Sequence, residues 1–166
     1  GDKKDMPEIF SNCTKPLICA VNGHAITGGF EIALNCDFMI ASENASFADT
    51  HAKVGIHPGW GMTQLLQQAI GQRRARQMSF SCEFITAATA FQWGLVNEMV
   101  HPSLLMPRAL QIAHTICNVN AEYLQTMRRL INARNQTTME KALAKEKQGF
   151  ELFVSGQMLL KDTPSV

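Results

Sequence analysis

Short apolar runs alternate with stretches of helical periodicity along the first hundred residues of this chain. Apolar runs that contain β-branched residues and end at turn residues are typical of buried strands. They predict strands at residues 17–21, 37–41, 46–48 and 95–100. Apolar residues spaced three and four apart predict helices at residues 6–13, 62–70, 73–80 and 86–93, and another that begins at Gly28. Strands that alternate with helices indicate the α/β class.

Beyond residue 101 the pattern is helical to the end of the chain. Three successive apolar stripes keep helical spacing, and only Glu146 interrupts them: Leu105, Ala109, Ile112, Ala113 and Ile116; Tyr123, Met127, Leu130 and Ile131; Met139, Leu143, Phe150 and Phe153. We therefore divide the chain into a body, residues 1–100, and a C-terminal helical region, residues 101–166. Such a region predicts packing against another subunit or back over the body.

Composition narrows the classes of function. The 166 residues are 46% hydrophobic and carry a formal net charge of +1, so neither nucleic acid nor a membrane surface is an expected partner. The five cysteines are odd in number and never spaced as CxxC, which predicts buried thiols in a reducing compartment. No apolar run approaches the ~18 residues of a membrane span, and the charged start lacks the apolar region of a signal peptide.

The glycine turn at residues 22–31 is the first candidate for chemistry. GHAITGGFE matches neither of the glycine-rich nucleotide-binding motifs. The N–H of Gly28, at the start of a helix, is instead suited to an oxygen that gains negative charge, and Glu31 lies one turn further on. A structural alternative remains open, in which Gly28 is the N-cap and Glu31 reaches back in a capping box.

A second candidate is the polar stretch ADTHAKVGIHPGWG, residues 48–61. It is too irregular for a long element, and loops held by a rigid scaffold commonly carry function. His51 and Asp49 are its candidates for acid/base chemistry, with a polar or solvated loop position as the alternative for each. Trp60 either lines an acyl pocket or belongs to the core.

Three segments together resemble the enoyl-CoA hydratase/isomerase (crotonase) superfamily. They are KPLICAVNGHAITGGFEIALNCDFMIAS, FADTHAKVGIHPGWGMTQLL and GLVNEMV, all within residues 15–100. The resemblance implies a crotonase-type fold of stacked ββα units with a C-terminal helical region, assembled as a homotrimer or a dimer of trimers. It also implies an acyl-CoA thioester as substrate, with CoA as part of that substrate, no other cofactor and no metal.

Carried over residue by residue, the resemblance assigns a site. Gly28 matches the glycine of the second oxyanion amide, and Glu31 matches the first catalytic carboxylate of the hydratases. The implied substrate-binding residues are Asn22, His24, Ala25, Ile26, Asp49, Pro58, Gly59 and Trp60. Hydration of trans-2-enoyl-CoA to 3-hydroxyacyl-CoA is therefore the expected lyase activity.

Two departures from the family pattern keep other functions open. His51 stands where two-carboxylate hydratases have their second Glu, so Glu31 would share the acid/base work with an imidazole. The first ββα units, which normally supply the other oxyanion amide, have no counterpart, so we expect an N-terminally truncated chain. The alternatives are another crotonase-type enzyme, an isomerase or decarboxylase, and a non-catalytic subunit. The expected location is the cytoplasm, or the mitochondrion if a targeting peptide is missing.

Other chemistries are less well supported by the sequence. The five histidines show neither HExxH nor clustered carboxylates, and no serine lies in a GxSxG elbow, which argues against a metalloenzyme and a serine hydrolase. The RRAR run at residues 73–76 suits either CoA phosphates or a solvated helix face.

Overall fold

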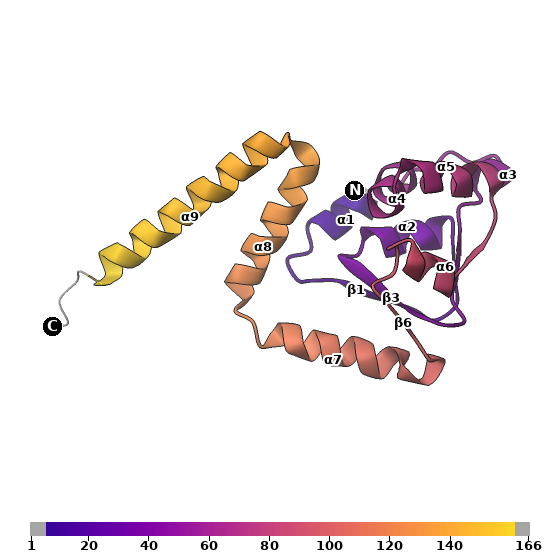
Figure 1. Cartoon of the computed structure of the whole chain (residues 1–166), viewed down its shortest axis with the longest axis horizontal. Coiled ribbons are helices and arrows are strands. Elements are labelled where there is room, and N and C mark those ends of the chain that lie inside the picture. Colours follow the sequence, from indigo (N-terminus) through magenta and orange to yellow (C-terminus); the bar gives the residue numbers. More distant parts are fainter. Residues whose placement is uncertain (1–5, 162–166) are drawn as a thin grey trace, which may run out of the picture. The chain divides into compact units, whose positions relative to one another are not determined.

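The computed structural model describes residues 6–161, with side chains up to residue 156. The chain divides between Asn118 and Val119 into two compact units (Figure 1). The first unit contains every strand of the described residues, and the second consists of helices. Among the helices of residues 6–161, none is long and apolar enough to cross a lipid bilayer.

Two three-stranded sheets organise the first unit. One sheet is parallel throughout, with its strands in the order β1 (Ile18–Val21), β3 (Phe38–Ser42) and β6 (Glu98–Val100). The other has the order β2 (His24–Ile26), β4 (Ser46–Ala48) and β5 (Ile85–Thr86), with β5 antiparallel to β4. The first four strands thus alternate between the two sheets, and a helix follows each of these two pairs.

Helices connect and cover these strands. In the first unit they are α1 (Met6–Ser11), α2 (Gly28–Asn35), α3 (His51–Val54), α4 (Met62–Ile70), α5 (Gln72–Ser81), α6 (Ala87–Gln92), the 3₁₀ turn η1 (Pro102–Leu104) and α7 (Leu105–Cys117). The second unit contains α8 (Ala121–Ala133), the 3₁₀ turn η2 (Arg134–Gln136) and α9 (Met139–Lys161).

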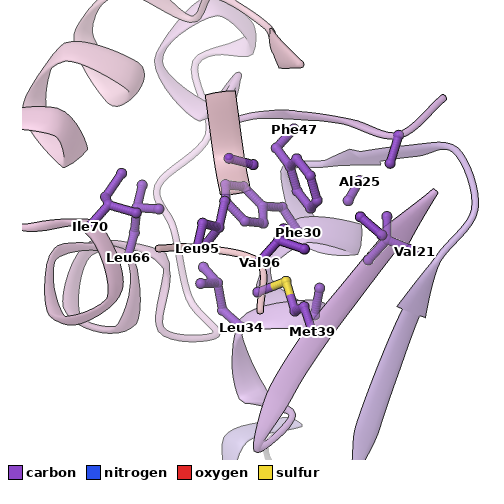
Figure 2. Packing of buried hydrophobic residues seen from close by; sticks show 14 of the residues in the cluster. Val21, Ala25, Phe30, Leu34, Met39, Phe47, Leu66, Ile70, Leu95 and Val96 are labelled. Carbon is purple, nitrogen blue, oxygen red and sulfur yellow. The ribbon is translucent and has the colours of Figure 1, made fainter. Parts of the chain in front are cut away.

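The main hydrophobic core fixes the position of α2. Phe30 of α2 and Phe47 of β4 are both fully buried, and their ring centroids lie 5.4 Å apart. Figure 2 shows these rings side by side, with Leu34 and Met39 beneath them. Because a fully buried large side chain contributes about 1.5–3 kcal/mol, this packing holds the N-terminus of α2 at a defined place.

The parallel sheet separates this core from a smaller one. Along β3, Met39 and Ala41 belong to the main core, whereas Ile40 packs with Leu105 and Ala109 of α7. This alternation is the period of two expected for a strand buried on both faces. Figure 1 accordingly shows α7 on the opposite side of the strands from α2. α7 therefore belongs with the body of the fold.

The mixed α/β prediction is confirmed, and the strand at 46–48 and the helix at 62–70 have the predicted bounds. Three short elements were missed. The strands β2 and β5 have three and two residues, too few to produce a readable period. The third is α3, a single helical turn that is followed by Gly55 with φ of 71°; it lies within residues 48–61, where the sequence predicted no long element.

The prediction of buried thiols is also wrong. Cys13, Cys19, Cys36 and Cys82 are only partly buried, and Cys117 is exposed. Cys36 and Cys82 are the C-cap residues of α2 and α5, so they lie at helix ends and outside the buried core clusters. All five are free thiols.

Candidate active site

Thr27 forms the turn that leads into α2. Its backbone, with φ of 52° and ψ of −113°, lies in a region that a β-branched residue rarely adopts. The Thr27 N–H donates to the carbonyl of Ala48 at 3.0 Å, and its hydroxyl pairs with that of Thr50 at 2.5 Å. Such strain persists only where neighbouring contacts hold it, and it is frequent at functional sites.

The strained turn leaves the first amides of α2 without helical partners. The first helical hydrogen bond runs from the Glu31 N–H to the Thr27 carbonyl at 2.9 Å. Within residues 6–161, the N–H of Gly28 donates to no protein acceptor. An amide at a helix N-terminus is a donor suited to a negatively charged oxygen. The capping-box alternative is wrong, because Thr27 is the N-cap and the Glu31 side chain bonds elsewhere.

The carboxylate of Glu31 is buried and held by backbone amides. Glu31 is only 2% exposed, and its Oε1 accepts the N–H of Trp60 at 2.9 Å and of Met62 at 3.1 Å. Asn35 strengthens the same junction by donating to the carbonyls of Glu31 and Trp60 at 2.8 and 2.7 Å. The segment from residue 60 to 62 is thereby fastened to α2, and Oε2 remains for another partner.

That partner is His51, which starts a chain of buried polar contacts. Its Nε2 lies 3.5 Å from Glu31 Oε2, and its Nδ1 lies 2.7 Å from Asp49 Oδ1. The hydroxyl of Ser79, on α5, donates to Asp49 Oδ2 at 2.6 Å. His51 and Asp49 are 5% and 2% exposed, so the interpretation of either residue as a solvated loop position is wrong.

Ser79 is the member of this chain of contacts that sequence reasoning missed. The sequence offers it only as a candidate for a GxSxG elbow, which it does not form. Its partner Asp49 lies 30 residues away in sequence, and a lone serine on a helix carries no periodic or motif signal. Only the packing of α3 against α5 brings the two side chains together.

Trp60, Gly59 and Pro58 lie on the loop opposite the start of α2. A Cβ added to Gly28 would come within 3.3 Å of the Trp60 ring, so this ring covers the glycine backbone. Trp60 is 37% exposed and therefore not a core residue. Gly59 is exposed and Pro58 partly buried. The ring and the Gly28 amide thus border the same surface.

The predicted substrate-binding residues before the turn occupy β2 and its approach. Asn22 and His24 are exposed, and Ile26 is partly buried. His24 Nδ1 lies 2.7 Å from the Ser46 hydroxyl, while Ala25 directs its side chain into the main core (Figure 2). The structure therefore brings Glu31, His51 and Asp49 into direct contact, and it leaves Asn22 and His24 at the surface.

A groove of about 300 Å³ lies elsewhere, between the strands β3 and β6 and helix α7. Its lining includes Phe38, Ile40 and the ion pair of Glu98 with Arg108, and none of the candidate site residues. Among the described residues, no cluster of His, Cys, Asp and Glu side chains is arranged to hold a metal ion.

Comparison with known proteins identifies the family. A sequence model described as enoyl-CoA hydratase/isomerase matches residues 3–161. A probable peroxisomal enoyl-CoA hydratase 1 of Arabidopsis thaliana is 38% identical over 161 residues, which cover 94% of this chain and 60% of the relative. A short-chain-enoyl-CoA hydratase of Clostridium acetobutylicum is 42% identical over 136 residues, covering 82% of this chain and 52% of the relative.

Solved structures agree with this result. An enoyl-CoA hydratase of Bacillus anthracis superposes with a TM-score of 0.83 at 35% identity, covering 87% of this chain and 56% of that one. An enoyl-CoA hydratase subunit of Geobacillus kaustophilus gives a TM-score of 0.84 at 30% identity, covering 96% of this chain and 65% of that one. The chain thus spans about half to two thirds of the length of these proteins. Its fold is the expected crotonase-type fold, in part, and the chain belongs to the enoyl-CoA hydratase/isomerase family.

Proposed function

We propose that this chain carries the acid/base part of an active site that hydrates trans-2-enoyl-CoA to 3-hydroxyacyl-CoA. The observation that supports this function best is the buried Glu31 carboxylate, held one helical turn from the N–H of Gly28, which has no acceptor among the described residues. An oxyanion donor beside a fixed acid/base group is the combination that the reaction requires. Relatives whose names specify enoyl-CoA hydratase activity support the same substrate class.

The chemistry assigns a role to each group. Water adds its oxygen to Cβ and a proton to Cα, and the electrons of the double bond pass transiently to the thioester oxygen as an enolate. The Gly28 N–H, at the positive end of α2, is the donor for that oxygen. Glu31 takes a proton from the attacking water and returns one to Cα, so the carboxylate is regenerated.

His51 shares this work in the proposal. Glu31 Oε1 is committed to two backbone amides, so proton transfer falls to Oε2, which faces His51 Nε2 at 3.5 Å. A water bound between or beside these two atoms would be oriented by both. Asn22, His24, Ile26, Pro58, Gly59 and Trp60 are proposed to contact the acyl-CoA, and Ala25 only through its backbone. CoA is part of the substrate, and we propose no further cofactor.

A complete site needs a second oxyanion donor. We propose that it comes from a ββα unit outside this sequence, which covers 60% of one relative and 56% of one solved hydratase. Loss of one such donor typically costs about 10²–10³ in rate. The chain by itself is then a weak catalyst or a non-catalytic subunit. We also propose assembly as a homotrimer or dimer of trimers, and the cytoplasm or mitochondrion as the compartment.

A second candidate is another reaction through the same thioester enolate, such as isomerisation or decarboxylation. His51 favours it, because an imidazole replaces the second carboxylate of the two-carboxylate hydratases. Relatives named carnitinyl-CoA dehydratase, 35% identical over 166 residues, indicate that related chains act on different acyl groups.

The test is hydration of crotonyl-CoA, followed as loss of enoyl absorbance. It is measured for this chain alone and for the chain extended at its N-terminus by the residues that precede it in its gene. In the more active form, Glu31→Gln should lower kcat by at least about 10²-fold, because the proton acceptor is lost. Glu43→Gln, at an exposed position, is the matched control and should leave kcat unchanged.

The outcomes separate the candidates. Activity that appears only in the extended form supports an incomplete site in this chain. Hydration at full rate by Glu31→Gln contradicts the proposed role of Glu31. Absence of hydration in both forms, together with turnover of an isomerase substrate, supports the second candidate instead.

A further inference from the structure

The contacts of His51 determine which of its ring nitrogens carries a proton. Nδ1 faces Asp49 Oδ1 at 2.7 Å, and the His51 backbone N–H donates to the same oxygen at 3.2 Å. An ionised carboxylate only accepts hydrogen bonds, so the proton of this contact belongs to Nδ1. The ring nitrogen that faces Glu31 is then Nε2, at 3.5 Å from Oε2.

Ser79 completes the constraint on Asp49. Its hydroxyl donates to Oδ2 at 2.6 Å, while Oδ1 is occupied by His51. Both oxygens of a carboxylate that is only 2% exposed are therefore fixed, one by α3 and the other by α5. Rotation of the carboxylate would break a bond on each side, so the ring of His51 has one favoured orientation.

No other charged group competes for the ring. Within the described residues, Glu31 and Asp49 are the ionisable side chains in contact with His51. Lys53 on α3 and the arginines of α5, Arg73, Arg74 and Arg76, are exposed. The environment of Nδ1 is thus set by Asp49 and Ser79.

We propose that Asp49 and Ser79 are positioning residues, which hold His51 with its proton on Nδ1 so that Nε2 serves Glu31 Oε2. Their role in catalysis rests on the proposed function, whereas the position of the proton does not. Neither residue touches the substrate in this scheme. Asp49, which the family resemblance assigns to substrate binding, acts through the imidazole instead.

Two substitutions of Asp49 test whether His51 needs a hydrogen-bond acceptor at this position or only a side chain of similar size. Asp49→Asn keeps an oxygen for the two donors of His51 and turns its amide to the Ser79 hydroxyl, which can accept. It should keep the Nδ1 proton and lose less than about tenfold in kcat. Asp49→Leu removes the acceptor, so the ring is free to carry its proton on either nitrogen. Its kcat should fall by about 10²-fold or more with KM little changed.

Ser79 provides a milder variant in case Asp49→Leu fails to fold. Ser79→Ala should lower kcat by about tenfold, since it removes one hydrogen bond to a charged group. Ser79→Thr keeps the hydroxyl and should restore the rate. Ser81→Ala, at an exposed position on the same helix, is the control and should behave as the parent chain.

The position of the proton on the His51 ring is measured by ¹⁵N NMR of histidine-labelled protein. The His51 signals are assigned by their loss in His51→Gln. The expected result is a protonated Nδ1 in the parent chain and in Asp49→Asn, and a mixture of tautomers in Asp49→Leu. An unprotonated Nδ1 in the parent chain overturns the proposal, as does a kcat within twofold of the parent in a folded Asp49→Leu. A protonated Nδ1, together with no hydration activity in either the chain alone or its N-terminally extended form, contradicts the proposed function and leaves the assignment of the proton intact.

Discussion

Glu31 has a structural role that is separate from its proposed chemistry. Its Oε1 accepts the amides of Trp60 and Met62, which ties the start of α4 to α2 across 29 and 31 residues of sequence. A buried carboxylate with two backbone donors is satisfied without a cation. Because these bonds occupy Oε1, only Oε2 is available for the proposed proton transfer.

This double role predicts that activity and stability separate at Glu31. Glu31→Ala leaves two N–H groups without an acceptor, each worth about 1–3 kcal/mol when buried. The free energy of unfolding, measured by urea denaturation, should fall by about 2–6 kcal/mol. Glu31→Gln keeps a carbonyl oxygen at the position of Oε1, which accepts both amides, so it should lose much less stability than Glu31→Ala while losing the reaction as completely. Equal stability of the two variants would contradict the proposed anchoring.

Sequence reasoning found the residues with local signals and missed those defined by distant contacts. Gly28 and Glu31 lie in one recognisable turn, and the N–H of Gly28 is indeed unpaired within residues 6–161. The burial of Asp49 and His51 depends on α5, which no pattern within residues 48–61 reveals. The contact of Ser79 with Asp49 is absent from any local window. The sequence thus names Glu31, His51 and Asp49 as candidates, but it reveals neither the burial of the last two nor the contact with Ser79.

A surface pair gives a prediction about pH. Arg108 donates two hydrogen bonds of 2.7 Å to the Glu98 carboxylate and holds the pKa of that carboxyl below its ordinary value of 4.5. The pair therefore stabilises the fold above pH 4.5, and this contribution disappears as the pH falls through the lower pKa of the folded state. Both side chains are about a third exposed, so solvent screens the interaction and the effect is small.

The measurement compares the parent chain with Glu98→Gln in urea. The parent should be the more stable at about pH 7 and about pH 5, and the difference should shrink as the pH is lowered further. Glu43→Gln is the control at an exposed position and should show no such convergence. A difference that grows on acidification would contradict the sign derived from the pKa.

At the scale of elements, glycine determines where α4 begins. Gly61 has φ of 108°, and a Cβ at this position would lie 2.9 Å from Leu65 Cδ1. A Cβ at Gly59, two residues earlier, would meet no other atom within 4 Å. The turn that presents the Trp60 and Met62 amides to Glu31 therefore depends on one glycine of this segment and not on the other.

Gly61→Ala should consequently destabilise the chain by about 1–2 kcal/mol, since a side chain disfavours this backbone conformation. Gly59→Ala is the matched control and should change the free energy of unfolding by less than about 0.5 kcal/mol. Urea denaturation of both variants provides the comparison. Equal stability of the two variants would show that the turn before α4 does not depend on the positive φ of Gly61.

The length of a helix or strand determines whether it can be predicted from the spacing of its apolar residues. The helix at 62–70 and the strand at 46–48 follow from apolar spacing bounded by glycine or by polar turns. The two-residue strand β5 and the single turn α3 exist because neighbouring strands and the buried His51 hold them. Their stabilisation is tertiary, so the local sequence does not reveal it.

At the scale of the molecule, both sheets have an early strand at an edge. The orders β1-β3-β6 and β2-β4-β5 leave β1 and β2 each with one unpaired side among the described residues. Unpaired strand edges are sites for the addition of further strands. This arrangement agrees with a chain that spans about half to two thirds of its relatives.

The helices of the second unit carry large apolar side chains at the surface. On α8, Tyr123, Met127 and Ile131 are each at least half exposed. The Tyr123 ring also packs edge-on against Phe153 of α9, with centroids 5.9 Å apart. Spacing by four places these residues on one stripe of α8, and a contiguous apolar surface of this kind usually marks an interface.

We therefore expect this stripe to contribute to the proposed oligomer. Met127→Glu introduces a charge that an apolar interface would have to bury, so the oligomer should dissociate. Gln125→Glu adds the same charge at an exposed polar position of α8 and serves as the matched control. Sedimentation velocity at micromolar concentration should give a larger species for the parent chain and Gln125→Glu, and a monomer for Met127→Glu. A parent chain that sediments as a monomer would contradict the role of this stripe, because its apolar residues would then remain exposed without a second copy to cover them.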